Sequence, residues 1–532
     1  MNFRSREQKK CQVKPGPKGL QKRAARDLID QARHTKSTQK VAREISKSIK
    51  WGAPKLTLVK LIEKNILIYG VIISTGYGVV TLEGLLIAFI SEVFTTQSFS
   101  IGLVVNLYQN DTMNLLIGAL LLNPRNPLDQ GSSVHASTTL ATIILGDSTI
   151  ASILDPVGNL IFNSGRININ YPWAIESPAP GIIDRQSVTE ALQTGVIAID
   201  SSIPIGCGQR ELILGDRQTG KTSICIDTIL NQKYRFIFTV YTSLGQSSSS
   251  ILQVFLSLLQ KDAIFYLSML MATASSSAVH QYLCAYSSTA LSEFFVITGE
   301  FPSLLILDDL SRHACAYREI YLLLRRPAGR EAYPGEIFFV HSRLLERSAK
   351  LSYNLGGGSL TSFPVIETLA GDLSGYISTN VISITDGQIA LSADLFLSGI
   401  LPAIDVGLSV TRVGSIAQWY GMKYVAALYK LELAQFIELQ SFSQFAADLG
   451  QESKNRLTKG LRLVEILKQS SRSPINLTRQ VGILSLSNQN LLKALAVKDV
   501  HLFLNLYLDI PAWTLLLIPP RLLGKSIVCC VF

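Results

Sequence analysis

The eight residues 215–222, GDRQTGKT, constrain this chain more than any other segment. They match the pattern GxxxxGK[ST], in which two glycines allow a tight turn whose backbone N–H groups converge on one anion. The preceding RELIL favours a strand and the following TSICIDTIL favours a helix, whose N-terminus adds positive potential. The sequence therefore predicts a loop that binds the phosphates of ATP or ADP. The candidate nucleotide-binding residues are Gly215, Asp216, Arg217, Gln218, Thr219, Gly220, Lys221 and Thr222.

A magnesium ion is expected beside these phosphates. Lys221 can reach the β- and γ-phosphates, and the Thr222 hydroxyl can ligate Mg²⁺. Residues 304–309, LLILDD, read as a buried strand that delivers a carboxylate to the same sheet edge. Any buried strand can end in aspartate at a turn, but the loop earlier in the chain favours the metal interpretation. We therefore predict Asp308 as the metal-side carboxylate and Asp309 as its structural neighbour.

The strand expected after the loop's helix, FIFTVYTSLGQ, ends in Gln246. Nucleotide-hydrolysing enzymes usually place a glutamate at this point to polarise the attacking water. Because a neutral amide cannot accept a proton, general-base catalysis is disfavoured here. The sequence predicts a site that binds nucleotide without turning it over; the alternative is that Gln246 is simply a loop residue.

The basic charge of the chain is concentrated at its N-terminus. Residues 1–50 contain 15 Lys and Arg against 4 Asp and Glu, whereas the whole chain has a net charge of +10. The rest of the chain is therefore close to neutral. A solvated arm, contact with an acidic partner or lipid headgroups, nucleic-acid contact and a targeting segment all remain open. Only Phe3 is aromatic within the arm, which disfavours base stacking and nucleic-acid binding.

The mean hydropathy of +0.28 raises the question of membrane spans. Stretches of at least eighteen residues without Asp, Glu, Lys or Arg occur at 65–82, 93–110, 236–260 and 263–292. Each is interrupted by glycines or by a polar run, so we expect shorter strands and helices and no transmembrane helix. The seven cysteines show neither metal-binding spacing nor a disulfide framework, and we interpret them as structural or incidental.

The rhythm of the chain indicates several domains. Short apolar runs between residues 55 and 137 favour a small all-β unit. A proline-rich connector at 176–183 is followed by alternating strand-like and helix-length segments, which favour an α/β domain with a largely parallel sheet. After about residue 415 the pattern becomes helical.

Four longer strings resemble the α subunits of F-type ATP synthases. They are PIGCGQRELILGDRQTGKTS (204–223), LLLRRPAGREAYPGEIFFVHSRLLERSAKLS (322–352), PVIETLAGDLSGYISTNVISITDGQI (364–389) and PAIDVGLSVTRVGS (402–415). The resemblance extends from about residue 60 to about residue 480. Other segments are more similar to chloroplast and cyanobacterial members than to mitochondrial ones.

This resemblance implies a multidomain α/β chain. Its parts would be a basic arm (1–60), an N-terminal β-barrel (61–137), a central RecA-like P-loop domain (138–414) and a C-terminal helical domain (415–532). Three such chains would alternate with three β subunits around a γ shaft, and the N-terminus would meet the δ subunit or peripheral stalk. The family implies a position on the stromal side of the thylakoid membrane, with the mitochondrial inner membrane or a bacterial inner membrane as alternatives.

The resemblance also assigns functional residues. Arg412 matches the arginine finger that reaches the γ-phosphate in a neighbouring β site, and Ser409 matches the signature serine beside it. Gln469 matches a glutamine of the adenine pocket. The chain departs from the family at Thr411, which replaces a serine, and at Leu401, which replaces an arginine of that pocket. Further departures are Cys207, Ser247–Ser250 and Ser471.

Two other functions stay open. One is an autonomous hexameric RecA-like ATPase for secretion or nucleic-acid translocation, which would need a catalytic glutamate. The other is a nucleotide-binding scaffold with no catalytic role, which would fit the changes at Leu401 and in the last fifty residues.

Overall fold

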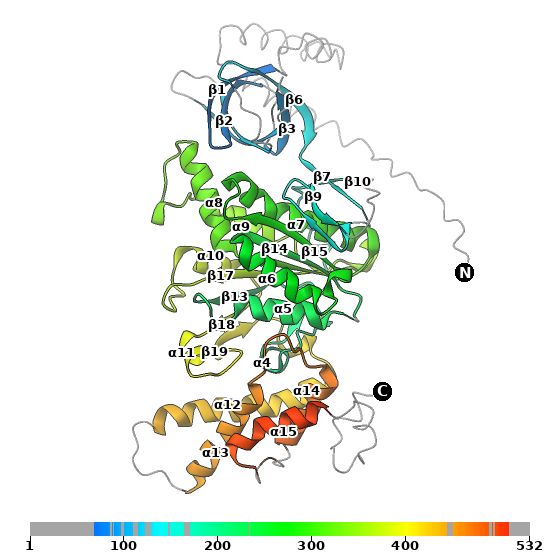
Figure 1. Ribbon diagram of the computed structural model, residues 1–532, viewed down its shortest axis with the longest axis vertical. Coiled ribbons are helices and arrows are strands. Elements are labelled where there is room, and N and C mark those ends of the chain that lie inside the picture. The colour runs from blue at the N-terminus through cyan, green and yellow to red at the C-terminus, as the bar shows by residue number, and fades with distance from the viewer. Residues whose placement is uncertain are drawn as a thin grey trace, which may run out of the picture. The chain divides into compact units, whose positions relative to one another are not determined.

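The computed structural model describes residues 69–509, except for 86–87, 89, 97–100, 110–114, 123–128, 147–148, 164–170, 234, 444–450, 489–491 and 493–494 (Figure 1). The predicted basic arm and residues 510–532 lie outside the described part. The chain divides into two compact units, Met1–Ala141 and Thr142–Phe532, and each is described by itself.

The described part of the first unit forms a closed antiparallel barrel with the strand order β1-β2-β5-β4-β3-β6. Its interior is filled by apolar side chains that alternate along the strands, among them Ile72, Leu82 and Phe94. Gly102 is required by this filling, because a Cβ there would lie 2.1 Å from the Phe94 ring. The predicted β-barrel is confirmed. Its strands are β1 (Tyr69–Gly76), β2 (Val79–Gly84), β3 (Glu92–Thr96), β4 (Ile101–Gln109), β5 (Leu115–Leu121) and β6 (Ser133–Leu140).

The second unit is built on a nine-stranded sheet with the order β19-β18-β13-β17-β16-β14-β15-β8-β9. The strands from β18 to β8 run parallel, and β19 and β9 are antiparallel edges. The predicted, largely parallel sheet is confirmed. The strands are β8 (Ser152–Leu154), β9 (Leu160–Asn163), β13 (Glu211–Gly215), β14 (Phe238–Gln246), β15 (Leu267–Thr273), β16 (Ser303–Asp308), β17 (Leu360–Glu367), β18 (Gly387–Leu391) and β19 (Ile404–Thr411). Two small pairs, β7 (Thr142–Leu145) with β10 (Tyr171–Ala174) and β11 (Ala191–Leu192) with β12 (Ile205–Gly206), accompany the sheet.

Helices cover this sheet. Apolar side chains of α5 and α6, such as Ile224 and Ile251, share one core with Ile213, Ile306 and Val365 of the strands. The helices are α4 (Ile197–Ser202), α5 (Lys221–Asn231), α6 (Ser248–Leu259), α7 (Ala278–Gly299), α8 (Leu310–Leu323), α9 (Ile337–Leu345), α10 (Tyr376–Ile384) and α11 (Ala393–Leu397). Short 3₁₀ turns are η3 (Ala263–Tyr266), η4 (Arg330–Ala332), η5 (Tyr353–Leu355) and η6 (Gly414–Ala417).

The C-terminal part of this unit is helical, as predicted (Figure 1). Its helices are α12 (Tyr420–Ser443), α13 (Gln451–Leu467), α14 (Leu477–Asn488) and α15 (Val497–Asp509). They share a core that includes Tyr429, Phe436 and Leu463, and the Tyr429 hydroxyl donates to the Leu463 carbonyl at 2.7 Å. At Gly460 of α13, a Cβ would lie 1.9 Å from the Phe436 side chain, so the two helices approach closely.

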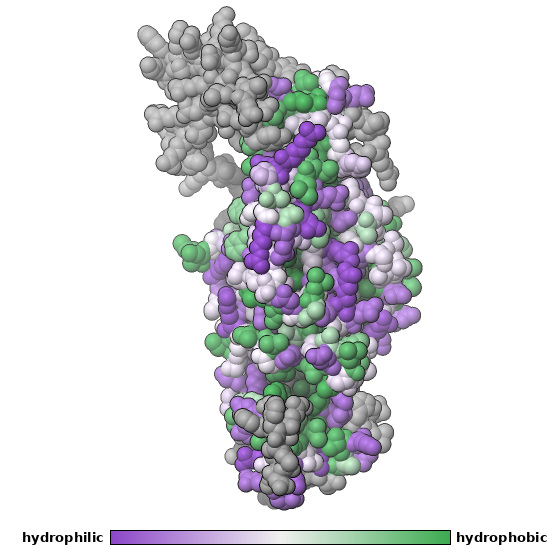
Figure 2. Space-filling view, turned by 90° about the vertical axis from the view of Figure 1, so that its left-hand side faces the viewer, coloured by the Kyte–Doolittle hydropathy of each residue, from purple (hydrophilic) through white to green (hydrophobic). Residues whose placement is uncertain are grey.

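Each of the four uncharged stretches is divided between two elements, as the sequence predicted: β1 and β2, β3 and β4, β14 and α6, and β15 and α7. Only α7, with 22 residues, is longer than expected. Among the described residues, no helix combines the length and the apolarity that a bilayer crossing requires. Figure 2 shows a face of the molecule on which hydrophilic and hydrophobic residues are interspersed.

Candidate nucleotide-binding site

The predicted phosphate loop lies between the C-terminal end of β13 and the first residue of α5. Gln218 and Gly220 have positive φ values of 61° and 97°, so the loop turns tightly before the helix starts at Lys221. A glycine suits the second position, because other residues rarely adopt this conformation. The N-terminus of α5 is therefore aimed into the loop, where its free N–H groups favour an anion.

Lys221 lies folded over the loop. Its Nζ donates to the carbonyl oxygens of Gly215 at 2.7 Å and Asp216 at 2.5 Å. Burial lowers the pKa of Lys221, while nearby carboxylates, led by Glu367, oppose that effect. The ammonium group is thus already desolvated and oriented, and phosphate oxygens can take the place of these carbonyl oxygens.

Thr222 and Asp308 meet on the other side of the loop. The Thr222 Oγ1 donates to the Asp308 Oδ2 at 2.9 Å, and the buried Tyr241 hydroxyl donates to the same oxygen at 2.8 Å. A hydroxyl and a carboxylate are hard oxygen donors of the kind that Mg²⁺ prefers. Both residues therefore fit a magnesium ion bound with a triphosphate, as the sequence predicted for them.

Asp309 has a different environment. Its carboxylate accepts from the Arg312 backbone N–H at 2.7 Å and caps α8. Burial raises its pKa to about 7. These contacts agree with the prediction that Asp309 is a structural neighbour of the metal-side residue.

Gln246 is the last residue of β14, next to β16 in the sheet. Its Nε2 donates to the Asp308 backbone carbonyl at 3.4 Å. The residue at the position expected of a catalytic carboxylate therefore lies beside the metal-side strand and carries a neutral amide. The loop interpretation of Gln246 is wrong, because the residue belongs to the strand.

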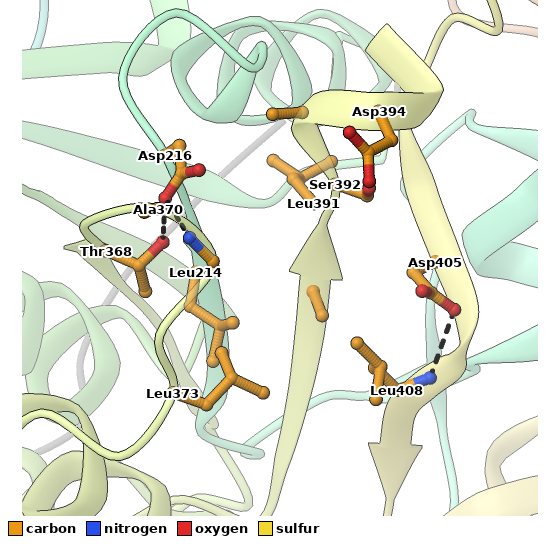
Figure 3. A pocket seen from close by; sticks show the side chains of 13 residues that line it. Leu214, Asp216, Thr368, Ala370, Leu373, Leu391, Ser392, Asp394, Asp405 and Leu408 are labelled. Atoms are coloured by element: carbon orange, nitrogen blue, oxygen red, sulfur yellow. Dashed lines mark hydrogen bonds between the residues drawn. The ribbon is translucent and has the colours of Figure 1, made fainter. Parts of the chain in front are cut away.

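The first half of the loop is held by side chains from β17 and the residues after it. The Asp216 Oδ1 accepts from the Thr368 hydroxyl at 2.7 Å and from the Gly371 N–H at 2.9 Å (Figure 3). Exposed Arg217 pairs with Glu367, and the Thr219 hydroxyl donates to the Asp216 carbonyl at 2.8 Å. These contacts shape the loop from within. Sequence reasoning did not identify Glu367, Thr368 or Gly371, whose only signal is their place in the string 364–389.

A cavity of about 290 Å³ adjoins Asp216 and Thr368 (Figure 3). Its other walls come from β18, β19 and the residues between them, including Asp394 and Asp405. Lys221, Thr222 and Asp308 are not among its lining residues, so the cavity adjoins the phosphate loop at Asp216 without including the residues expected to contact phosphate and magnesium.

Gln469 follows α13 and is bound within the protein. Its Nε2 donates to the carbonyls of Gly195 at 2.9 Å and Ser473 at 2.7 Å, and its Oε1 accepts from the Ile197 N–H at 3.3 Å. Its own N–H donates to the carbonyl of Leu401 at 2.8 Å, which brings the two expected pocket positions together. Contact of Gln469 with a nucleotide base stays a prediction.

Arg412 lies at the amino-terminal ends of the parallel strands, whereas the phosphate loop lies at their carboxyl ends. Thr411 pairs with Gly387, and Gly387 pairs with Glu211 at the start of β13, whereas the loop leaves the other end of β13. Arg412 is exposed, and its guanidinium makes no hydrogen bond or ion pair within the part of the chain that the structure describes. It lines a cavity of about 350 Å³, together with Arg185, Arg210, Lys350 and Asp386.

Ser409 is buried within β19. Its Oγ donates to the Asp405 carbonyl at 2.5 Å and accepts from the Ala390 N–H at 3.0 Å. The first bond lies within β19, and the second joins this strand to β18. The predicted catalytic role of Ser409 stays a prediction.

Family models agree with this geometry. The model of the ATP synthase alpha/beta family, nucleotide-binding domain, matches residues 195–411. The model of the ATP synthase alpha/beta chain, C terminal domain, matches residues 418–511. Together they cover more than half of the chain and include the phosphate loop, Gln246, Asp308 and Gln469. The chain therefore belongs to the ATP synthase alpha/beta family and has the architecture of a nucleotide-binding subunit of that hetero-oligomeric catalytic head.

Proposed function

We propose that this chain is an α-type subunit of a proton-driven rotary ATP synthase. Its own site binds Mg-ATP or Mg-ADP without hydrolysing it. Arg412 acts in trans, at the catalytic site of a neighbouring β subunit. The partners in this proposal are alternating β subunits, the γ shaft and a peripheral stalk, and the location is the stromal side of the thylakoid membrane.

The observation that carries the proposal is the placement of Arg412. Glu211 and Gly215 are the two ends of β13, and four residue steps of a strand span about 13 Å. Arg412 lies level with the first end, and the phosphate loop leaves the second. Arg412 is thus anchored at the far ends of the strands from the phosphate loop of its own chain, which supports an action on a neighbouring subunit.

The chemistry of such a residue is electrostatic. In phosphoryl transfer, charge develops on the equatorial oxygens of the transferred group, and an arginine supplied in trans stabilises it. A guanidinium is suited to this task because it is always charged and presents several donors in a fixed plane. Magnesium, when bound with the nucleotide, neutralises charge between the β- and γ-phosphates.

Gln246 supports the assignment of the chain's own site as non-catalytic. Its amide can orient a water molecule but cannot accept the proton of that water. The same observation disfavours an autonomous hexameric ATPase. A scaffold without catalytic role is disfavoured by the exposed Arg412, which nothing in the described part of the chain engages.

The test is reconstitution with cognate β and γ chains, comparing the wild type with Arg412→Ala. We expect hydrolysis to fall about 10³-fold, as for other arginine fingers. Nucleotide binding at the loop of Lys221 should be unchanged, since the substitution lies at the other sheet edge. Lys423→Ala, which removes an exposed cation from α12, is the matched control and should leave hydrolysis unchanged.

Two results would refute the proposal. Normal hydrolysis by the Arg412→Ala head would remove the trans-acting role. Hydrolysis at an ordinary rate by this chain alone would show that Gln246 does not prevent turnover and would favour the autonomous ATPase.

A further inference from the structure

We propose that Gln209 and Glu211 are positioning residues for Arg412. They hold the side chain of Thr411 and thereby fix the backbone from which the finger projects. This inference rests on the proposed function of Arg412. The residues belong to the string that contains the phosphate loop, but they lie at the other end of β13 and take no part in phosphate binding.

Gln209 is wholly buried, and both the oxygen and the nitrogen of its side-chain amide form hydrogen bonds. The Oε1 accepts from the Gly206 N–H at 2.9 Å. The Nε2 donates to the Glu211 Oε2 at 2.6 Å and to the Thr411 Oγ1 at 3.0 Å. Because the oxygen faces an N–H donor and the nitrogen faces two acceptors, only one orientation of the amide satisfies all three contacts.

The Thr411 hydroxyl is held from two sides. It accepts from Gln209 and donates to the Pro204 carbonyl at 3.3 Å. Arg412 is the next residue, and its N–H donates to the Asp386 carbonyl at 2.8 Å. A side-chain contact at Thr411 and a backbone contact at Arg412 thus fix the end of β19, while the guanidinium itself stays free.

Glu211 anchors the Gln209 amide, because its Oε2 accepts from the Gln209 Nε2. It has no exposed surface, and burial raises the pKa of its carboxyl well above 4.5. Within the described residues, its Oε1 has no hydrogen-bond partner. The carboxyl fills the space left by Gly387, where a Cβ would lie 2.4 Å from Oε2 and 2.6 Å from the Val410 carbonyl oxygen. The acidic group therefore lies directly against the backbone of β18 and β19.

A purely structural role does not explain this choice of residues. Burying a carboxyl with one unpaired oxygen is costly, and an apolar side chain of similar volume fills such a position at lower free energy. The carboxyl oxygen at this point gives the Gln209 Nε2 a second acceptor, beside the Thr411 hydroxyl. The amide is then oriented toward Thr411, and a small error in the position of a catalytic group has a large effect on rate.

The primary test is Thr411→Val in the reconstituted head. Valine keeps the volume of threonine and removes the hydroxyl. Gln209→Met is the second variant; it also leaves the Gly206 N–H without its acceptor. We expect Thr411→Val to lower kcat about tenfold, since a misplacement near 1 Å can cost up to about 100-fold. Thr411→Ser, which keeps the hydroxyl, should retain most of the activity.

The matched control is Thr239→Val on β14. Thr239 is also buried and also donates its hydroxyl to a carbonyl, that of Tyr266 at 3.1 Å. It should show the stability loss of a removed hydroxyl without the loss in kcat. A second readout is binding of ADP with aluminium fluoride, which mimics the transferred phosphoryl group: Thr411→Val should weaken it about tenfold and leave binding of ADP alone unchanged.

A double-mutant cycle with Arg412→Ala decides the mechanism. If Gln209 and Thr411 act through the finger, Thr411→Val has no further effect on kcat once Arg412 is removed. An equal loss of kcat in both backgrounds, or a Thr411→Val head as active as the Thr239→Val control, would overturn the positioning role alone. A fully active Arg412→Ala head would overturn the proposed function and this inference together.

Discussion

The cationic side chains at the two ends of the parallel strands, Lys221 and Arg412, have different surroundings. At the carboxyl ends of the parallel strands, Lys221 is half-buried and bonded to two carbonyl oxygens of its own loop. At the opposite edge, Arg412 is exposed, and only its backbone is bonded within the described chain. The carboxyl edge is thus arranged to hold a ligand within one chain. In the proposed function, Arg412 at the opposite ends of the strands offers its charge to a neighbouring subunit.

The supporting residues differ in the same way. Thr222 and Tyr241 both donate directly to the Asp308 carboxylate, and Thr222 and Asp308 would also contact the bound ion. Gln209 bonds to the Thr411 side chain, and Thr411 is linked to Arg412 only through the peptide backbone. A binding site for a ligand of the same chain needs side chains that converge, whereas a residue that acts on another subunit needs a rigid base and a free side chain.

The largest expected effect at the carboxyl edge is that of Lys221→Ala. The ammonium group is expected to contact two phosphates, and hydrogen bonds to charged groups contribute about 1.5–3 kcal/mol each. Affinity of the isolated chain for Mg-ATP, measured by calorimetry, should therefore fall at least about 100-fold. Hydrolysis by the assembled head should fall much less, because Lys221 belongs to the proposed non-catalytic site and lies far from Arg412, which is proposed to act at the catalytic site. Equal losses of affinity and of hydrolysis would contradict the assignment of Lys221 and Arg412 to two different sites.

Glu211→Gln tests the opposite edge through pH. Burial raises the pKa of Glu211, so the folded state keeps a proton that the unfolded state releases above pH 4.5. Stability of the wild type should therefore fall as pH rises from 4.5 toward the raised pKa, by at most about 1.4 kcal/mol per pH unit from this group. Glutamine removes the contribution. Urea unfolding at pH 5 and pH 7 should show a smaller loss for the variant; an equal loss would mean that Glu211 is ionised in the fold.

Ser409→Ala should have the smallest effect. The hydroxyl bonds the edge strand internally, and a hydrogen bond of this kind contributes about 1 kcal/mol. We expect a stability loss of that size and nearly normal hydrolysis by the reconstituted head. A loss of hydrolysis comparable to that of Arg412→Ala would instead place Ser409 in the catalytic machinery.

Much of the carboxyl edge could be predicted because its residues are contiguous. Residues 215–222 contain the glycines, the lysine and the threonine in one run, and the flanking periodicities gave the strand and the helix. Asp308 could be predicted as well, since the carboxyl ends of parallel strands meet on the same side of a sheet. These inferences needed the pattern of the sequence and one topological rule.

The contacts that link distant segments were not predicted. Thr368 holds Asp216 from a segment 152 positions away, and Gln209 holds Thr411 from 202 positions away. Neither hydroxyl differs in the sequence from the other threonines of the strands. Which of them meet depends on strand order and register, and the periodicity of one segment does not specify its neighbours.

The phosphate loop, the neutral Gln246 and the succession of barrel, parallel sheet and helices could be read from the sequence, and so could the prediction that Thr222 and Asp308 hold magnesium. Each of these is encoded in local spacing, propensity or residue chemistry. The tertiary structure alone decided that Arg412 leaves the sheet at the edge opposite Lys221, with a buried amide and carboxyl beneath it. The physical reason is that β19 joins the sheet antiparallel beside β18, a pairing set by the packing of the whole domain.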